Sequence, residues 1–531
     1  MSRARELDDQ HLGGADAIQA DLCVVGTGAA GLAIALHFAG SPVRVALLEG
    51  GGVTREGTAG GVYKVVHAPT PRLEIEPELT WRFGGNTNHW FGNCRPLDHA
   101  DFEAREWIPY SGWPIGRPAL VPFYLQAQRM CGLADFRAYD VAACQPQLGH
   151  FADVEPTTLT PKVVQTCPVP SFDLLYGRRI READNLRVCL GVRAQRLETN
   201  AAGDTVRAVV CCDAEGRRSR VSARVFVLAA GGIENPRLLL CSTDVHQNGL
   251  GNAHDLVGRF FMEHPYVDIP LGESSRACDL LFQPRRQRIG DTTVWAQLAL
   301  SDAIMRRERV TGLSLWGVPP AMRPSATTAT PTDVGQPDSM LRRRLLRRVP
   351  GLWRDPTAVA AQAWRRLTRR EGATPAAGSR ILRVAFEQAP DPRNQVRLST
   401  ERDPFGLPAA ELVYHVTDED VQRHARSLAI AAHALGLDGP RIAERMQRRW
   451  GDGEVYFFWH HMGTTRMHPD PRHGVVDSDC SVHGVSNLFI AGSSVFPTSG
   501  TATPTLTIIA LALRLAEHLR QQMLPDASPV T

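Results

Sequence analysis

A glycine-rich segment near the N-terminus constrains the fold of this chain more than any other feature. The apolar run Leu22–Val25 precedes Gly-Thr-Gly-Ala-Ala-Gly at positions 26–31, and residues 29–38 have helix-forming composition. A second apolar run, Val43–Leu48, ends at the acidic residue Glu49. A strand, a glycine turn, a helix, a strand and an acid in this order make the dinucleotide-binding fingerprint of a parallel α/β fold. We therefore predict a Rossmann-like domain.

The three glycines of this turn have separate tasks. Gly26 allows the tight turn, Gly28 lets the backbone approach a pyrophosphate, and Gly31 lets helix and strand pack closely. Glu49 is expected to accept hydrogen bonds from the ribose hydroxyls of the adenosine half. The fingerprint alone does not separate FAD from NAD.

A second segment, near the C-terminus, combines a histidine pair with a predicted helix start. Residues 460–464 read His-His-Met-Gly-Thr, and an apolar strand is expected at Leu488–Ala491. Thr503 suits an N-cap and Pro504 suits the first helical position. The positive end of that helix would favour an anion in front of it. A histidine base facing such a helix end suggests alcohol oxidation, provided that an electron acceptor lies between them.

Four motifs carry a family resemblance. Residues 84–90 read Gly-Gly-Asn-Thr-Asn-His-Trp, the apolar run 225–228 leads into Gly231-Gly232, and residues 496–500 and 504–507 read Phe-Pro-Thr-Ser-Gly and Pro-Thr-Leu-Thr. These stretches resemble, in turn, the flavin-contacting loop, the turn that completes the FAD site and the closing segment of glucose–methanol–choline (GMC) oxidoreductases. The block at 460–464 resembles the His-x-x-Gly-Thr signature of the same family. The resemblance covers most of the chain, is nearest to a pyranose-oxidase-like bacterial branch, and implies FAD.

The resemblance implies a fold class and a domain plan. The fold is expected to be α/β, with a Rossmann-like FAD-binding domain and an α+β substrate domain built on a mostly antiparallel sheet. Residues 15–110, 186–269 and 455–525 would form the discontinuous FAD-binding domain. Residues 111–185 and 270–454 would form the substrate-binding domain, whose strands include Arg383–Pro390 and Asn394–Ser399, with a flexible, basic insertion at about 318–378.

Three residues are catalytic candidates. In the family the catalytic histidine stands three residues before the glycine of Gly-Thr, which makes His460 the expected base and leaves His461 as the alternative. A neutral histidine suits this task because its pKa lies near neutral pH. The family's Asn or His before the closing proline is replaced by Thr503, which would donate to the substrate directly or through water, or leave that role to His461.

The flavin would take the hydride at N5, and the helix start at Pro504 would stabilise the negative charge of reduced flavin. At His89 a covalent bond to the flavin and a noncovalent loop histidine stay equally open. His264, in Glu-His-Pro, is interpreted as a hydrogen-bonded structural histidine. The expected cofactor-binding residues are Gly26, Gly28, Ala29, Ala30, Gly31, Glu49, Gly50, Gly84, Gly85, Thr87, Asn88, His89, Trp90, Val192, Ala230, Gly231, Gly492, Ser493, Pro504 and Thr505.

Composition excludes several classes of function. The chain has 531 residues, of which 22% are charged, and a net charge of only +3, so nucleic acid is not the expected partner. Eleven cysteines without a C-x-x-C pair argue against a disulfide framework and a zinc site, and no metal is expected. The first twenty residues are polar and no apolar run is long enough to span a bilayer, so we expect a cytoplasmic protein.

The arginine clusters at 341–370 allow two interpretations. A solvated helical excursion is favoured over a basic amphipathic helix that touches a membrane or a partner.

The expected function is FAD-dependent oxidation of a primary or secondary CH–OH group to a carbonyl, on a sugar, glycoside, amino sugar or cyclitol. Oxygen, a quinone and a carrier protein stay open as the electron acceptor. The alternatives are oxidation of a non-sugar alcohol, a lyase that uses FAD structurally, and a non-redox flavin-binding protein.

Overall fold

The computed structural model describes residues 18–53, 63–67, 81–141, 143–144, 157–213, 215–271, 281, 287–318 and 380–524. Apart from Val318, the predicted insertion at 318–378 lies outside the described residues, and so do the arginine clusters at 341–370. Among the described helices, none combines the length and the apolar composition needed to cross a membrane.

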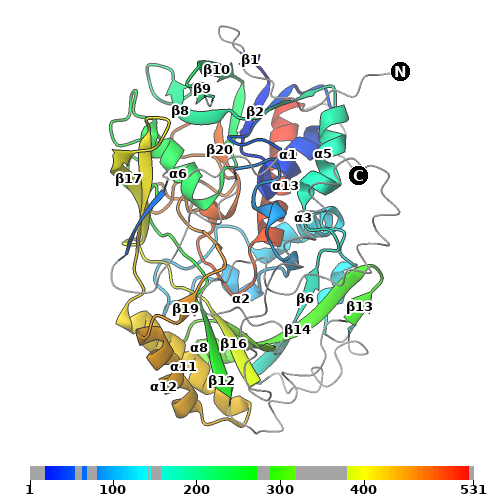
Figure 1. Cartoon of the computed structure of the whole chain (residues 1–531), viewed down its shortest axis with the longest axis vertical. Helices are drawn as coiled ribbons and strands as arrows, with labels where there is room; N and C mark the ends of the chain where they lie inside the picture. Colours follow the sequence, from blue (N-terminus) through cyan, green and yellow to red (C-terminus); the bar gives the residue numbers. More distant parts are fainter. Residues whose placement is uncertain are drawn as a thin grey trace, which may run out of the picture.

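A five-stranded parallel sheet occupies the upper half of the molecule in Figure 1. Its order is β20-β11-β2-β3-β7, and β2, β3 and β20 are buried along their whole length, as strands of a sheet that is covered on both faces are. The strands are β20 (Leu488–Ile490), β11 (Val225–Leu228), β2 (Leu22–Val25), β3 (Val45–Leu48) and β7 (Leu186–Cys189). The predicted Rossmann-like unit is confirmed.

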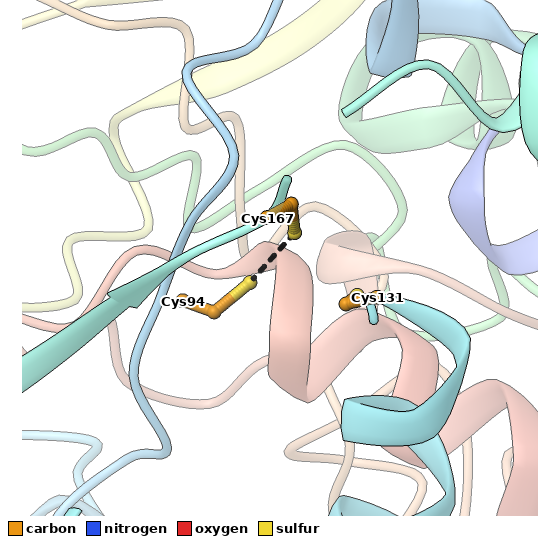
Figure 2. Close-up of side chains that lie close together, drawn as sticks. All are labelled: Cys94, Cys131 and Cys167. Atoms are coloured by element: carbon orange, nitrogen blue, oxygen red, sulfur yellow. Dashed lines mark hydrogen bonds between the residues drawn. The ribbon is translucent and has the colours of Figure 1, made fainter. Parts of the chain in front are cut away.

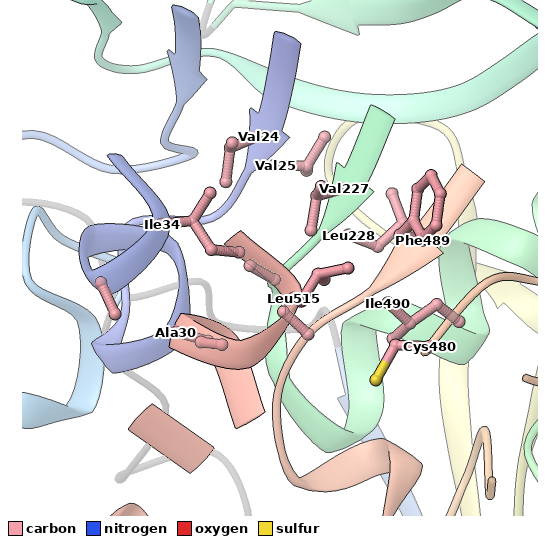
Figure 3. Close-up of a cluster of buried hydrophobic side chains, with 14 of the residues drawn as sticks. Val24, Val25, Ala30, Ile34, Val227, Leu228, Cys480, Phe489, Ile490 and Leu515 are labelled. Atoms are coloured by element: carbon pink, nitrogen blue, oxygen red, sulfur yellow. The ribbon is translucent and has the colours of Figure 1, made fainter. Parts of the chain in front are cut away.

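Two helices, α1 (Ala29–Phe38) and α13 (Thr505–Met523), pack together beside this sheet. Figure 3 shows Ile34 of α1 and Leu515 of α13 in one apolar cluster with Val24 and Leu228 of the sheet. Nearly every residue of α1 is buried, since the helix lies between the sheet and α13. This burial explains why its sequence is apolar all round rather than amphipathic.

The alternating polarity of Leu186–Leu197 predicts a half-buried strand, which the structure divides in two. After β7 the chain turns at Gly191, whose φ is +67°, and β8 (Arg193–Thr199) joins a different sheet. That sheet has the order β1-β10-β9-β8, with β1 (Ile18–Gln19), β10 (Arg218–Ser222) and β9 (Val206–Cys212). Alternating polarity predicts strand structure over this stretch without locating the turn, because a glycine in the left-handed region leaves the pattern unbroken.

An eight-stranded sheet forms the lower half of the molecule (Figure 1). All its described pairs are antiparallel, which confirms the expected mostly antiparallel sheet. Its order is β19-β12-β16-β15-β14-β6-β5, with β13 on β14. The strands are β19 (Val455–Tyr456), β12 (Tyr266–Leu271), β16 (Arg380–Phe386), β15 (Leu313–Val318), β14 (Thr292–Leu300), β6 (Leu159–Thr166), β5 (Asn93–Cys94) and β13 (Gln287–Ile289). Helices α11 (Asp418–Ala434), α12 (Gly439–Gly451) and α8 (Asp302–Glu308) lie at this end of the molecule.

Some segments pack differently from the domain plan. The strand expected at Asn394–Ser399 is β17 (Gln395–Arg402), which pairs with β18 (Pro408–Tyr414) in a small sheet with β4 (Tyr63–His67) and contacts α6 (Gly231–Cys241). Within 111–185, helix α3 (Arg117–Met130) contacts α13 and helix α5 (Phe172–Glu182) contacts α1. Of the described residues in this range, only those of β6 enter the eight-stranded sheet. The domain boundaries stay a prediction.

Candidate active site

The carboxyl ends of the parallel strands open into a cavity of about 890 Å³ that reaches the eight-stranded sheet. The residues that follow β2, β3, β11 and β20 line one end, and side chains of β14, β15 and β16 line the other. Ligands of doubly wound sheets bind at this edge of the strands. The fold therefore joins the predicted cofactor end and the predicted substrate end in one space.

The glycine turn fits the task predicted for it. A Cβ on Gly31 would lie 1.9 Å from the carbonyl oxygen of Gly26, and one on Gly26 would lie 2.5 Å from the carbonyl oxygen of Ala229. Packing thus requires both glycines. A Cβ on Gly28 would meet no atom within 4 Å, and Gly28 lines the cavity at the start of α1. This open space in front of a helix N-terminus suits an anionic pyrophosphate.

Glu49 lies in the same wall and is held by the turn itself. Its carboxylate accepts hydrogen bonds from the backbone N–H groups of Thr27, at 3.2 Å, and Gly51, at 3.0 Å, and from the Thr27 hydroxyl. Burial raises the pKa of Glu49 to about 7. The predicted contact with ribose hydroxyls stays a prediction.

The flavin-type loop is shaped by two residues that do not line the cavity, Gly84 and Asn88. Gly84 has a φ of +91°, which favours glycine, and the Asn88 amide donates to the carbonyl oxygens of Phe83 and Gly85, both at 3.0 Å. They shape the short helix η1 (Gly85–Asn88), and their predicted contact with the cofactor stays a prediction. The sequence motif does not separate a residue that shapes a loop from one that faces the ligand.

The other predicted cofactor residues divide in the same way. Gly31 faces the packed interior of the turn rather than the cavity. Helices α1, α6 and α13 all begin at the cavity wall, so three partial positive charges converge on it. The predicted residues that line the cavity are Gly26, Gly28, Ala29, Ala30, Glu49, Gly50, Gly85, Thr87, His89, Trp90, Val192, Ala230, Gly231, Gly492, Ser493, Pro504 and Thr505.

Sequence reasoning missed Arg193. Its guanidinium lies between the rings of Trp81 and Phe405, 3.5 and 3.6 Å from their centroids, beside Val192 in the wall. The position next to Val192 is the only sequence signal for Arg193, because Phe405 is brought here by the fold.

Covalent attachment of a flavin at His89 stays open.

The predicted base, His460, is bonded to a second histidine. Its Nδ1 lies 2.9 Å from Nδ1 of His264, and Nε2 of His264 lies 3.2 Å from the carbonyl oxygen of Ser499. A carbonyl oxygen can only accept, so the network assigns the proton of His264 to Nε2 and leaves its Nδ1 as an acceptor. His460 must then donate from Nδ1, which leaves a lone pair on its Nε2.

Burial favours the neutral form of both rings. It lowers the pKa of His264 to about 4 and holds the pKa of His460 well below its usual value of 6.5. His460 lines the cavity, and the residue before it, Trp459, has a φ of +58°. A left-handed tryptophan is strained, and such strain occurs where a structure holds a neighbouring group in place.

His461 has a different environment. Its ring is buried beside Phe261, and its Nε2 lies 3.6 Å from Oε1 of Glu263, too far for a hydrogen bond. Burial lowers the pKa of His461 to about 4 and raises the pKa of Glu263 well above its usual range, which favours the neutral form of each group. Although His461 also lines the cavity, its backbone carbonyl, which accepts from the Ser493 hydroxyl, holds the turn.

The predicted role of Thr503 as N-cap is wrong. Helix α13 begins at Thr505 with Pro504 as its N-cap residue, and no side chain caps it. The Thr503 hydroxyl instead donates to the carbonyl oxygen of Asn93 at 2.8 Å. That bond links two parts of the cavity wall, and it occupies the hydrogen that a substrate contact would need.

Aromatic side chains surround a few polar groups at the far end of the cavity. The aromatic residues are Tyr266, Trp295, Trp316, Phe458 and Trp459, and the polar ones include Gln297 and Arg383. The buried indole N–H of Trp295 has no hydrogen-bond partner among the described residues. The Arg383 guanidinium is bonded to both carboxylate oxygens of Asp268 at 2.8 Å. Apolar walls with a few placed donors are typical of small-molecule sites.

Comparison with known proteins connects this site to a family. Residues 390–512 match the model of the C-terminal region of GMC oxidoreductases. The large subunit of fructose dehydrogenase from Gluconobacter japonicus is 28% identical, over 66% of this chain and 57% of its own length. The 6'''-hydroxyparomomycin C oxidase of Streptomyces lividus is 25% identical, over 95% of this chain and 92% of its own.

Solved structures agree on the fold. Formate oxidase superposes with a TM-score of 0.62 at 17% identity, over 96% of this chain and 99% of that one. Pyridoxine 4-oxidase gives a TM-score of 0.55 at 17% identity, over 96% and 100%. The two sequence relatives are a dehydrogenase and an oxidase, so the lyase alternative has no support. Residues 390–512 thus carry the C-terminal region of GMC oxidoreductases, and nearly the whole chain is similar in sequence to an oxidase and in fold to solved oxidases.

Proposed function

We propose that this protein oxidises a CH–OH group of a sugar, glycoside, amino sugar or cyclitol to a carbonyl, with His460 as the base. The observation that carries the proposal is the pairing of His460 with His264, in the same cavity as the dinucleotide turn. Bound FAD would supply the hydride acceptor. The cavity residues fit this cofactor through the open space at Gly28 and the helix N-termini around it.

The proton chemistry follows from the histidine pair. Nε2 of His460 takes the proton of the substrate hydroxyl, because its lone pair is free while Nδ1 is committed as a donor. The positive charge that develops on His460 is stabilised by the Nδ1 lone pair of His264, which stays neutral. His264 therefore acts as a positioning residue. His461, buried beside Glu263, has the geometry of a neighbour.

The substrate class is inferred from the far wall and the relatives. Indole and phenol rings present flat apolar faces with polar edges, which suit ring compounds that carry both C–H faces and hydroxyls. The names of the relatives, a fructose dehydrogenase and a hydroxyparomomycin oxidase, agree with a carbohydrate-like substrate.

A substrate screen tests this proposal. The purified holoprotein is mixed anaerobically with simple alcohols, sugars, glycosides, aminoglycosides and cyclitols, and the loss of flavin absorbance is recorded. We expect carbohydrate-like alcohols to bleach the flavin. Bleaching only by simple alcohols would contradict the substrate class, and no bleaching by any compound would contradict the oxidation itself.

Reoxidation of the bleached enzyme with oxygen or a quinone then identifies the electron acceptor. Acid precipitation reports whether FAD is bonded to His89, because a noncovalent flavin is released into the supernatant.

The partner of His460 can be tested by substitution. His264→Met removes the acceptor at similar volume, and we expect anaerobic flavin reduction to slow by about 10- to 100-fold, the loss of one charge-assisted hydrogen bond. His264→Gln returns an amide oxygen and should recover most of this rate. Equal rates in the two variants would mean that His264 only fills space.

The unpartnered indole of Trp295 gives a second prediction. Trp295→Phe keeps an aromatic face and removes the N–H, so KM for the best carbohydrate substrate should rise by about 2- to 10-fold with unchanged FAD content. Trp316→Phe, on the neighbouring strand β15, serves as the matched control. A KM that does not respond to Trp295→Phe would place the substrate elsewhere in the cavity.

A further inference from the structure

Three cysteines that are far apart in the sequence meet behind the cavity wall (Figure 2). Cys94 ends β5, Cys131 follows the last residue of α3, and Cys167 follows the last residue of β6. All three are at most 1% exposed, and their sulfur atoms lie within 4.8 Å of one another. The sulfurs of Cys94 and Cys167 are 3.8 Å apart. This arrangement is a three-thiol cluster outside the catalytic machinery.

The spacing suits a single metal ion. A tetrahedral ion with metal–sulfur bonds of about 2.3 Å separates neighbouring sulfur ligands by about 3.8 Å. Thiolates select thiophilic ions, since carboxylate or carbonyl oxygens are the ligands of hard cations. In an apolar interior a bound cation also compensates the thiolate charge that burial would otherwise disfavour.

Tyr139 supplies an independent observation. Its phenol oxygen is buried and has no hydrogen-bond partner among the described residues. The Tyr139 ring packs against the buried cluster that contains Cys94, Cys131 and Cys167. A buried polar atom normally has a partner, and the Tyr139 phenol lacks one among the described residues.

We propose that Cys94, Cys131 and Cys167 bind one thiophilic d¹⁰ metal ion, Zn²⁺ or Cu⁺. Binding forms three metal–sulfur bonds, breaks the three S–H bonds and releases the protons to solvent, with no change of oxidation state. The sequence predicts no such site, because each cysteine stands alone in its segment and the usual short ligand spacing is absent.

The place of the cluster gives the ion a structural task. Asn93, whose carbonyl accepts from Thr503, and Arg95, whose guanidinium donates to the Thr501 hydroxyl at 3.0 Å, flank Cys94 and line the cavity. The Cys167 N–H donates to the Gly92 carbonyl at 2.8 Å. A bound ion would fasten this part of the wall to α3 and β6 from behind.

Metal content tests the proposal without reference to activity. The full chain is produced with added zinc in one arm and added copper under reducing conditions in the other, and bound metal is measured by mass spectrometry. We expect about one ion per chain in at least one arm, with metal–sulfur scattering near 2.3 Å in X-ray absorption. Cys131→Ala should bind less than a tenth of this amount. Cys480→Ala, another buried cysteine, should bind as much as the wild type.

Two results would overturn the proposal. Metal-free protein with all eleven thiols titratable after denaturation would mean that the cysteines only pack together. If only nine thiols are titratable after denaturation and a reductant restores the other two, Cys94 and Cys167 form a disulfide instead. If Cys131→Ala does not fold, a titration of the wild-type holoprotein with Co²⁺ is used in place of this variant. Thiolate coordination is expected to give sulfur-to-cobalt charge-transfer bands, and their absence would count against the site.

Discussion

The His460→Ala variant is expected to bind FAD as the wild type does and to reduce it about 10² to 10⁴ times more slowly with its best alcohol substrate. The loss follows because His460 lines the cavity, its Nδ1 is committed as a donor to His264, and its Nε2 keeps a lone pair. Stopped-flow absorbance under anaerobic conditions measures the rate, and the flavin-to-protein ratio measures binding.

His461→Gln is the matched control, and its rate should fall by less than about tenfold, because the ring it replaces faces Glu263 at 3.6 Å. If His461→Gln loses the rate and His460→Ala keeps it, the base is His461.

The pH dependence of the rate gives a further check on the base. Burial lowers the pKa of His460 below 6.5, so the neutral, active form persists as pH falls, and the acid limb of the wild-type rate should lie below pH 6.5. A limb above pH 6.5 would contradict the buried base.

The Gly31→Ala variant should lose retained FAD, with an affinity at least about 100-fold weaker. Its methyl group would lie 1.9 Å from the Gly26 carbonyl oxygen, which is backbone and cannot rotate away as a side chain could. Overpacking of this kind costs about 3 kcal/mol, which corresponds to about 100-fold in affinity when the displaced turn is the binding site. Flavin content after gel filtration and titration of the apoprotein with FAD measure the effect.

Gly451→Ala, at the end of α12, is the control, because an added methyl there meets no atom within 4 Å and the position is outside the cavity. It should keep the wild-type flavin content. Normal FAD content in Gly31→Ala would mean that the turn can open without loss of binding, and the assigned role of the fingerprint would be wrong.

Local chemistry determined a large part of the fold and of the site. The span predicted for α1, Ala29–Phe38, is the observed one, because a glycine turn and the loop at Gly40 mark its ends. The pattern of apolar and polar residues over Val206–Cys212 predicts a half-buried strand, and the structure has β9 there. His460 could be singled out because its spacing from Gly463 is a property of one short turn.

What depends on distant segments could not be read in this way. Thr503 satisfies every local rule for an N-cap, yet its hydroxyl donates to Asn93, which is brought beside it by tertiary packing. Gly84 and Asn88 belong to the flavin-type motif but do not line the cavity. Whether a residue faces a cavity is decided by the packing of whole helices and strands, whereas a motif records only residue types.

The sequence by itself determined the dinucleotide turn, the family resemblance and the histidine pair, because each depends on residues within a few positions of one another. Only the tertiary structure decided which atoms those residues meet. It brought His264, which stands just before β12, to His460, in the turn before Gly463. The hydrogen bond between them assigns the proton on each ring. It also gathered Cys94, Cys131 and Cys167 into one cluster. Hydrogen bonds and metal ligation act over about 2 to 3 Å, and contacts at that range between distant segments exist only once the sheets and helices have packed.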